Sequence, residues 1–450
     1  MSNELNSFLF STPEMTHVFS QGQQLRAMMR FEWALLGSLE SQGIAEAGSS
    51  AVLEPLLDVG FVDLASLRRD ATDAGNIALP FVRQLTEEVR VRNEKAARAI
   101  HLGATSQDVL DSALVLQIRD ALELLTSAME RLDQFFVRQV REHRQAMLTG
   151  RTWLQPGPPT TFGLKLAGTL AALRRNRDRI HAAAKRAVVL QFGGAVGTLA
   201  ALGTAGGAVS AELARILDLR EPEMPWHTQR DNLVEIVQVL AILTGTLAKF
   251  ARDIALLMQF EVGEATEGGT EGRGGSSTMP HKHNPVACAA VIATHERMPG
   301  LAATMLHAMP QEHERGLGLW QAEWETVPDA FRLTAACLAY SIEIAEGFKV
   351  DTAHMQSNID ALLGLPLSEA VTIALAPKLG RSTAHDLLRA ATVRAAKENR
   401  SLAEILKGLP QVTAVLSDVE IDQLLDPHAY LGSTERFIAR VLGEVDDSGR

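Results

Sequence analysis

The sequence predicts an all-α protein built around a bundle of long helices. Residues 104–149 contain no glycine or proline, and apolar residues recur there at helical spacing over far more than the ~11–12 residues of a mean helix. Similar stretches rich in alanine and leucine occur at 164–190, 233–262 and 328–346, while the alternating patterns that predict strands are rare. Long apolar stripes can be buried only against one another, so a helical bundle is the expected core.

The chain divides by pattern into three segments. We expect an N-terminal helical domain at 1–104, a central long-helix domain at 105–346 and a C-terminal helical domain at 347–450, where glycine and proline separate shorter segments. The first long helix has a recognisable start. Thr105, followed three residues later by Asp108, resembles a capping box with an acidic first turn.

Composition and charge argue against several classes of protein. The 450 residues are 46% hydrophobic and 22% charged, which is typical of a globular chain. The formal net charge is −11, so duplex binding is not expected, and an anionic substrate would need a local basic pocket. We find no leader-like N-terminus and no apolar run near the length of a membrane span. Cys288 and Cys337 are expected to be free thiols in a cytoplasmic protein.

The segment 267–285 has the most unusual composition in the chain. Five glycines precede a pair of serines and a cluster that contains Lys282, Asn284 and two histidines, so donors and positive charge gather here in an acidic protein. A flexible surface loop is the alternative interpretation. A phosphate-binding loop is not expected, because the required spacing and a preceding strand are missing. A metal site is not expected either, because His281 and His283 have no partner at a usual ligand spacing.

The same loop carries a family resemblance. Residues 275–285, Gly-Ser-Ser-Thr-Met-Pro-His-Lys-His-Asn-Pro, resemble the signature G-S-S-x-M-P-x-K-x-N-P of the fumarase/aspartase superfamily. Residues 105–111 and 150–156 resemble two further family regions, and 194–198 fits the same order. The resemblance implies a mostly helical protomer of three domains, and a homotetramer in which three subunits build each active site. It implies no metal or organic cofactor, no nucleic acid and no membrane partner.

The resemblance also implies a chemistry. Superfamily members break or form a bond to the carbon β to a carboxylate, through an enolate-like dianion called an aci-carboxylate. By position, Ser276 would transfer the proton, with Ser277 as the alternative, while Lys282 and Asn284 would stabilise the dianion. Hydroxyl groups from two other blocks would bind substrate carboxylates: Thr105, Ser106 and Thr152. Simple helix capping is the alternative for Thr105.

Two departures from the family pattern narrow the reaction. Trp153 stands where many members carry histidine, and Ala289 where the loop usually continues to glutamate. Tryptophan cannot protonate a basic leaving group, but a carboxylate, with a pKa near ~4, needs no protonation. The departures therefore favour the lactone-forming cycloisomerase branch, in which Trp153 would contact substrate. Residues 226–231 and 320–324 resemble that branch, with helix packing as the alternative for the two tryptophans of the second block.

The expected reaction is the intramolecular addition of a carboxylate to a carbon–carbon double bond, with Ser276 as general acid. His101 matches a histidine of the succinyl lyases in this superfamily and would bind a carboxylate or relay the proton, with a structural histidine as the alternative. Lys282, Arg230 and Arg315 would supply the cations for a small tricarboxylate substrate. Together with the loop histidines His281 and His283, these three residues are the expected local basic pocket.

Three other functions are compatible with parts of the sequence. An adenylosuccinate-type or other succinyl lyase fits the loop and the histidine, but Trp153 and Ala289 disfavour it. A catalytically inactive structural member would keep only the fold, but intact Ser276, Lys282 and Asn284 disfavour it. A helical scaffold that binds another protein is the third alternative, and a monomer in solution would favour it.

Overall fold

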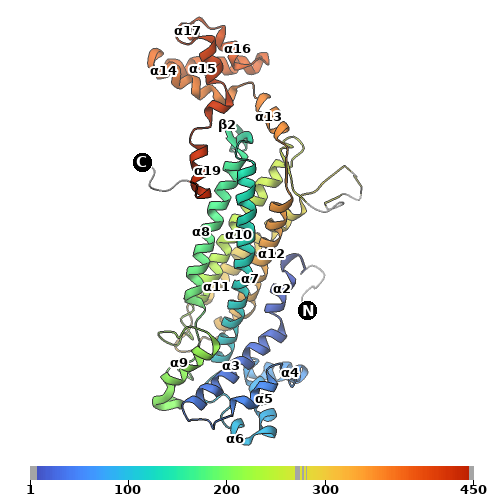
Figure 1. Cartoon of the computed structure of the whole chain (residues 1–450), viewed down its shortest axis with the longest axis vertical. Helices are drawn as coiled ribbons and strands as arrows, with labels where there is room; N and C mark the ends of the chain where they lie inside the picture. Colours follow the sequence, from blue (N-terminus) through green and yellow to red (C-terminus); the bar gives the residue numbers. More distant parts are fainter. Residues whose placement is uncertain (1–7, 269–273, 276–277, 280, 445–450) are drawn as a thin grey trace. The chain divides into compact units, whose positions relative to one another are not determined.

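A computed structural model describes residues 8–268, 274–275, 278–279 and 281–444 of the chain (Figure 1). Most of these residues are helical, as the sequence predicts, and the β structure that the ranges contain is limited to two two-stranded sheets and isolated bridges. The chain forms two compact units. Unit 1 is built from 1–129, 175–245 and 290–339, and unit 2 from 130–174, 246–289 and 340–450. The expected boundaries after 104 and 346 stay a prediction.

Five long helices contribute residues to both units (Figure 1). They are α7 (Ser106–Glu142), α8 (Phe162–Ala187), α10 (Asp231–Leu257), α11 (Val286–Ala308) and α12 (Leu319–Gly347). Four of them overlap the long helices that periodicity predicts. The first ends at Glu142 rather than at 149, and residues 147–149 form part of a β-strand instead. The fifth, α11, contains Pro299, which hides it from a search for stretches without proline.

Unit 1 holds the N-terminal helices and the first half of α7. Within it α3 packs against α9, and Phe31 of α3 meets Phe192 edge to face with 6.4 Å between ring centroids. Side-chain caps define several helix starts, as at Ser20 and Asp63. The elements confined to this unit are η1 (Phe8–Phe10), α2 (Pro13–Val18), α3 (Gln21–Ser41), η2 (Ser50–Leu56), α4 (Leu64–Ala74), α5 (Ala78–Arg92), α6 (Glu94–Ala97), η3 (Ala200–Ala205) and α9 (Gly206–Leu217).

Unit 2 combines the remaining parts of the long helices with a β-hairpin. Phe136 of α7 packs edge to face on Phe250 of α10 at 5.0 Å between centroids, and Arg174 of α8 pairs with Asp133 of α7 at 2.7 Å. The hairpin consists of β1 (Met147–Thr152) and β2 (Gln155–Thr161), and a short sheet pairs β3 (Ala265–Thr266) with β4 (Lys349–Val350).

The C-terminal helices of unit 2 surround a small apolar core of their own (Figure 1). Val371, Leu388 and Leu402 are among its buried members. Leu363 and Gly364 both have positive φ and separate α13 from these helices. The elements are α13 (Thr352–Asp360), η4 (Leu365–Leu367), α14 (Ser368–Leu379), α15 (Arg381–Glu398), α16 (Leu402–Lys407), α17 (Pro410–Thr413), α18 (Asp418–Leu424), η5 (Pro427–Tyr430) and α19 (Thr434–Leu442).

Two further expectations concern membrane-spanning segments and the two cysteines. Within the described residues, α10 is long and apolar enough to cross a membrane, and the bent pair formed by α13 and residues 365–379 passes the same test. Of the most apolar window of α10, 61% is buried inside the protein, as in a core helix. Cys288 and Cys337 are buried and not joined in a disulfide, as expected, and burial raises the pKa of both.

Candidate active site

The start of α7 in unit 1 is organised by one buried carboxylate. Asp108 accepts hydrogen bonds from the backbone N–H of Thr105 at 2.8 Å and from its hydroxyl at 3.0 Å. The bond from the Thr105 N–H to the Asp108 side chain is one half of the predicted capping box, while the Thr105 hydroxyl donates to the same carboxylate instead of accepting from the Asp108 N–H. Ser106 follows as the first residue of the helix. The uncapped N–H groups and the dipole of a long helix make this end suitable for an anion.

Asp108 also holds distant segments of the chain. Its Oδ1 lies 2.7 Å from Nε2 of His227 and accepts from Gln191 Nε2 at 3.2 Å. The backbone N–H groups of Gly193 and Gly194 donate to its two oxygens at 3.0 and 3.1 Å. A Cβ at Gly193 would lie 2.7 Å from the His227 ring, so only glycine permits this approach. Asp108 thereby joins the backbone at Thr105 to the backbone at Gly193 and Gly194.

Arg315 is the cation that unit 1 brings to this helix start. Its Nη2 donates to the Thr105 hydroxyl at 2.9 Å and its Nη1 to Gln107 Oε1 at 2.8 Å, while Nε donates to the Ala195 carbonyl at 3.2 Å. In the described part of the chain Arg315 forms no ion pair. Burial lowers its pKa, and the charges of Asp108 and Asp111 oppose this shift without reversing it. Arg315 therefore presents a positive charge that neutral acceptors orient but do not neutralise.

Arg230 lies instead in the protein interior. Its guanidinium is fully buried and binds Asp111 at 2.7 Å and Glu323 through three hydrogen bonds, while Trp320 Nε1 donates to Asp111 at 3.1 Å. Burial alone would lower the pKa of Arg230, but the two carboxylates outweigh it and raise the pKa. We name Arg230, Asp111, Glu323 and Trp320 the buried charge network. The network occupies the Arg230 donors. A direct contact of Arg230 with substrate stays a prediction.

The two tryptophans of residues 320–324, the second block that resembles the cycloisomerase branch, pack together. Trp320 and Trp324, four apart on α12, meet edge to face with 4.9 Å between ring centroids. The two tryptophans therefore pack against each other, which is compatible with the branch resemblance of this block.

His101 is held by a carboxylate that the sequence does not reveal. Its Nδ1 lies 2.6 Å from Glu32 Oε1, and its backbone N–H donates to Glu32 Oε2 at 3.1 Å. Burial opposes the charged imidazole, but the Glu32 carboxylate outweighs burial and raises the pKa of His101. The φ of His101 is +60°, an unfavourable value for a residue with a side chain, and Glu32 holds both backbone and ring in place.

In unit 2 the hairpin carries the second block of candidates. Arg151 forms a two-point ion pair with buried Glu264 at 2.7 and 2.9 Å, and Asn358 donates to the same carboxylate at 2.9 Å. This anchor fixes the strand that leads to Thr152 and Trp153. Trp153 is 99% exposed at the tip, so its large ring has no partner within its own chain's described residues.

The signature loop contributes the third block. Ser276 and Ser277 lie outside the described residues. Lys282 is exposed, and Asn284 is half-buried with its backbone N–H and its side-chain Nδ2 both donating to the Gly274 carbonyl, at 2.8 and 2.9 Å. The loop runs into α11, where the Glu267 carboxylate accepts from the N–H groups of residues 287 and 288 at 3.0 Å each.

Sequence reasoning missed three carboxylates that position the candidates. They are Glu32, Asp108 beyond its role as a cap, and Glu264. Glu32 gave one available signal, since it interrupts the apolar face of α3 between Phe31 and Leu35. The partners of Glu32 and Glu264 lie 69 and 113 residues away, so no local pattern links them.

The described residues thus combine a bundle of long helices with an arginine, Arg315, that hydrogen bonds orient at the start of α7. The chain belongs to the lyase family, because residues 19–300 match the family model described as Lyase, and residues 364–441 match the one described as Adenylosuccinate lyase C-terminus.

Individual relatives cover almost the whole chain. A 3-carboxy-cis,cis-muconate cycloisomerase from Pseudomonas aeruginosa is 47% identical over 98% of this chain and 96% of its own. The crystal structure of 3-carboxy-cis,cis-muconate lactonizing enzyme from Pseudomonas putida aligns with a TM-score of 0.92 at 46% identity, over 98% of this chain and 99% of that one. That of beta-carboxy-cis,cis-muconate cycloisomerase from Acinetobacter calcoaceticus aligns with a TM-score of 0.91 at 38% identity, over 98% and 100%. The expected superfamily and all-α class are confirmed.

Proposed function

We propose that this protein is a 3-carboxy-cis,cis-muconate cycloisomerase of the beta-ketoadipate pathway for protocatechuate breakdown. The observation that carries the proposal is the similarity over 98% of the chain to a relative of that name. The unneutralised charge of Arg315 beside Thr105 supports it, because a tricarboxylate needs cations in a protein of net charge −11.

The proposed reaction is an isomerisation, in which one part of the substrate adds to another. A carboxylate oxygen of the substrate adds to the carbon that bears the 3-carboxyl group, and the electron pair of the double bond moves onto the other terminal carboxylate. A proton then adds to the adjacent carbon, which gives 4-carboxymuconolactone. Ser276 delivers this proton in our assignment, and Lys282 with Asn284 stabilises the intermediate charge.

Unit 1 would bind substrate carboxylates. Thr105 and Ser106 with Arg315 would hold one carboxylate at the start of α7, where the helix dipole adds to the attraction. His101, kept in position by Glu32, would hold another or relay the proton. Arg230 would act through Asp111 and Glu323, by fixing the helices behind this site.

The proposed enzyme is a cytoplasmic homotetramer with shared active sites. Trp153 is almost fully exposed and Lys282 is exposed, so neither lies in an enclosed pocket of its own chain. Enclosure by further copies, as the superfamily resemblance implies, would exclude water from the reacting groups. Analytical ultracentrifugation tests the assembly: a tetramer of this 48.7 kDa chain supports shared sites, and a monomer contradicts them.

A succinyl lyase is the second candidate, because residues 364–441 match the C-terminal model of adenylosuccinate lyase. One paired assay distinguishes the two functions. The purified full-length protein receives 3-carboxy-cis,cis-muconate and, separately, adenylosuccinate, and NMR identifies each product. Loss of the diene absorbance with formation of 4-carboxymuconolactone supports the cycloisomerase. Turnover of adenylosuccinate alone would keep the family and overturn the assignment.

A further inference from the structure

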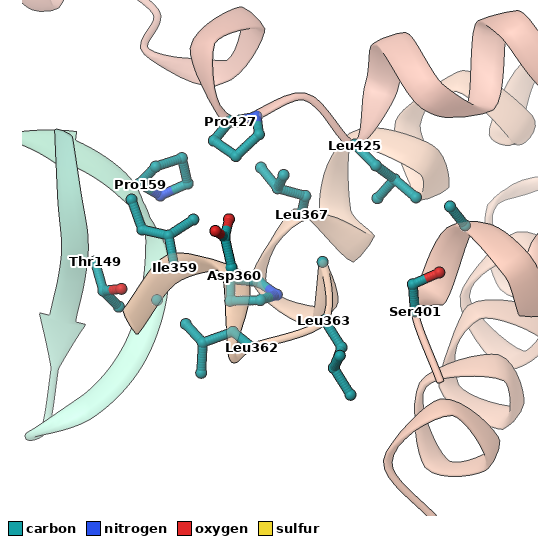
Figure 2. A pocket seen from close by; sticks show the side chains of 14 residues that line it. Thr149, Pro159, Ile359, Asp360, Leu362, Leu363, Leu367, Ser401, Leu425 and Pro427 are labelled. Carbon is teal, nitrogen blue, oxygen red and sulfur yellow. The ribbon is translucent and has the colours of Figure 1, made fainter. Parts of the chain in front are cut away.

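Unit 2 contains a pocket that the proposed reaction does not use (Figure 2). Its volume is about 270 Å³, and it lies between the hairpin, the connection from α13 to η4, and the starts of α16 and η5. Its walls are mainly apolar and include Pro159, Ile359, Leu363, Leu367, Leu425 and Pro427. The composition is that of a ligand pocket, with apolar walls and few polar groups.

One polar group in the lining lacks a partner. Thr149 of β1 is only 4% exposed, and in the described part of the chain its Oγ1 has no hydrogen-bond partner. The backbone carbonyl of Thr149 accepts from Arg151, so the unmet group is the hydroxyl alone. A buried hydroxyl without a partner is unfavourable, and a ligand that offers a donor or acceptor here removes that cost.

The second polar group gives the pocket its charge. The Asp360 carboxylate is directed into the space near Pro159 and Leu367 (Figure 2). It accepts one hydrogen bond, from Gln356 Nε2 at 2.8 Å, and forms no ion pair with any described residue. A negative charge beside apolar walls attracts a cation and repels the tricarboxylate of the proposed reaction.

We propose that this pocket binds a small organic cation that carries an ammonium group on an apolar body. The ammonium group pairs with Asp360, and the rest of the occupant lies against the apolar walls and Thr149. An apolar cavity of about 150 Å³ holds benzene, so this pocket accommodates one ring with a short chain. The occupant contacts both the hairpin and the residues around Leu363 and Gly364, and therefore restrains the C-terminal helices of unit 2 against β1 and β2.

Calorimetric titration of the full-length protein with phenethylamine tests this binding without reference to turnover. Phenethylamine is expected to bind at millimolar concentration or below, and phenylacetate, which has the same ring and the opposite charge, is expected not to bind. Asp360 is solvent-exposed, so Asp360→Asn should weaken phenethylamine by about fivefold, which corresponds to an exposed ion pair of about 1 kcal/mol. Thr149→Val should weaken it by a smaller factor.

Two further variants locate the site. Ala403→Trp places a ring in the pocket and should abolish binding. Asp386→Asn removes an exposed carboxylate from α15 of the same unit and should leave binding unchanged. The proposal is overturned if phenethylamine does not bind, if phenylacetate binds as well as phenethylamine, or if binding survives both Asp360→Asn and Ala403→Trp. Circular dichroism of each variant confirms that it is folded.

Discussion

The candidate residues of unit 1 and those of unit 2 differ in how their own chain holds them. In unit 1, Thr105, Arg315 and His101 are each fixed by hydrogen bonds to buried or half-buried partners. In unit 2, Trp153 and Lys282 are exposed, and only the backbone that leads to them is anchored. The contrast indicates that the candidates of unit 1 are held in place within their own unit, whereas the side chains of Trp153 and Lys282 are not. Changes in unit 1 should therefore affect stability, and changes in unit 2 only activity.

The largest expected effect comes from breaking the buried charge network with Arg230→Leu. Asp111 and Glu323 would remain buried without their cation, and removal of one member of a buried ion pair costs about 3–5 kcal/mol. Urea unfolding followed by circular dichroism measures the loss. Arg394→Leu is the matched control, because Arg394 pairs with Glu398 on an exposed helix surface and should change the free energy of unfolding by less than about 1 kcal/mol. Equal losses for the two variants would contradict the assignment.

Lys282→Ala should show the opposite behaviour. Because Lys282 is exposed, the urea midpoint should not change, while turnover of the muconate should fall by about 100-fold through loss of a donor to the developing charge. Lys397→Ala, an exposed lysine at the end of α15, serves as the control for a loss of charge alone. Turnover that stays within a few-fold of the unaltered protein would remove Lys282 from the catalytic assignment.

Glu32→Gln should change how stability depends on pH. The pKa of His101 is raised in the folded protein, so the stabilisation from its charged form is fully present below the unfolded pKa of about 6.5 and is lost as pH rises through the folded pKa. The difference in unfolding free energy between the two proteins should shrink as pH increases from 6. In a His101→Asn background this dependence should disappear. A difference that is independent of pH would show that the imidazole is not charged by Glu32.

The smallest effect is expected at the hairpin tip. Trp153→His should change the free energy of unfolding by no more than about 0.5 kcal/mol, since the side chain is exposed and φ is positive in both cases. It should not raise the rate of lactone formation, because a carboxylate nucleophile needs no histidine at this place. A clear gain in rate, measured in the muconate assay, would undermine the argument from the leaving group.

The sequence predicts the long helices well because their apolar stripes are local and uninterrupted. It does not predict the hairpin, since residues 155–161 contain three prolines and no alternation, and strand pairing there depends on backbone contacts. The hairpin turn is equally unexpected, because Trp153 and Leu154 both have positive φ, which is unfavourable for large side chains.

The candidate site likewise has parts that depend on local sequence and parts that depend on contacts between distant residues. The signature loop and the cap at Thr105 are short contiguous motifs, so a single sequence indicates them. The role of Asp108 as a common partner of Gly193 and His227 depends on contacts across 85 and 119 residues, which no local pattern encodes. The burial of Arg230 cannot be predicted from the sequence either, because the residues around it are the same whether the guanidinium is exposed or buried.

The buried charge network has a consequence for folding. Asp111 and Arg230 are 119 residues apart in the chain, and Arg230 and Glu323 are 93 apart, so these contacts close large loops and form late. Docking of only two of the three segments would bury a charge without its full set of partners, which is unfavourable. Partly docked intermediates of this region are therefore poorly populated. We therefore expect the three segments of the network to dock cooperatively.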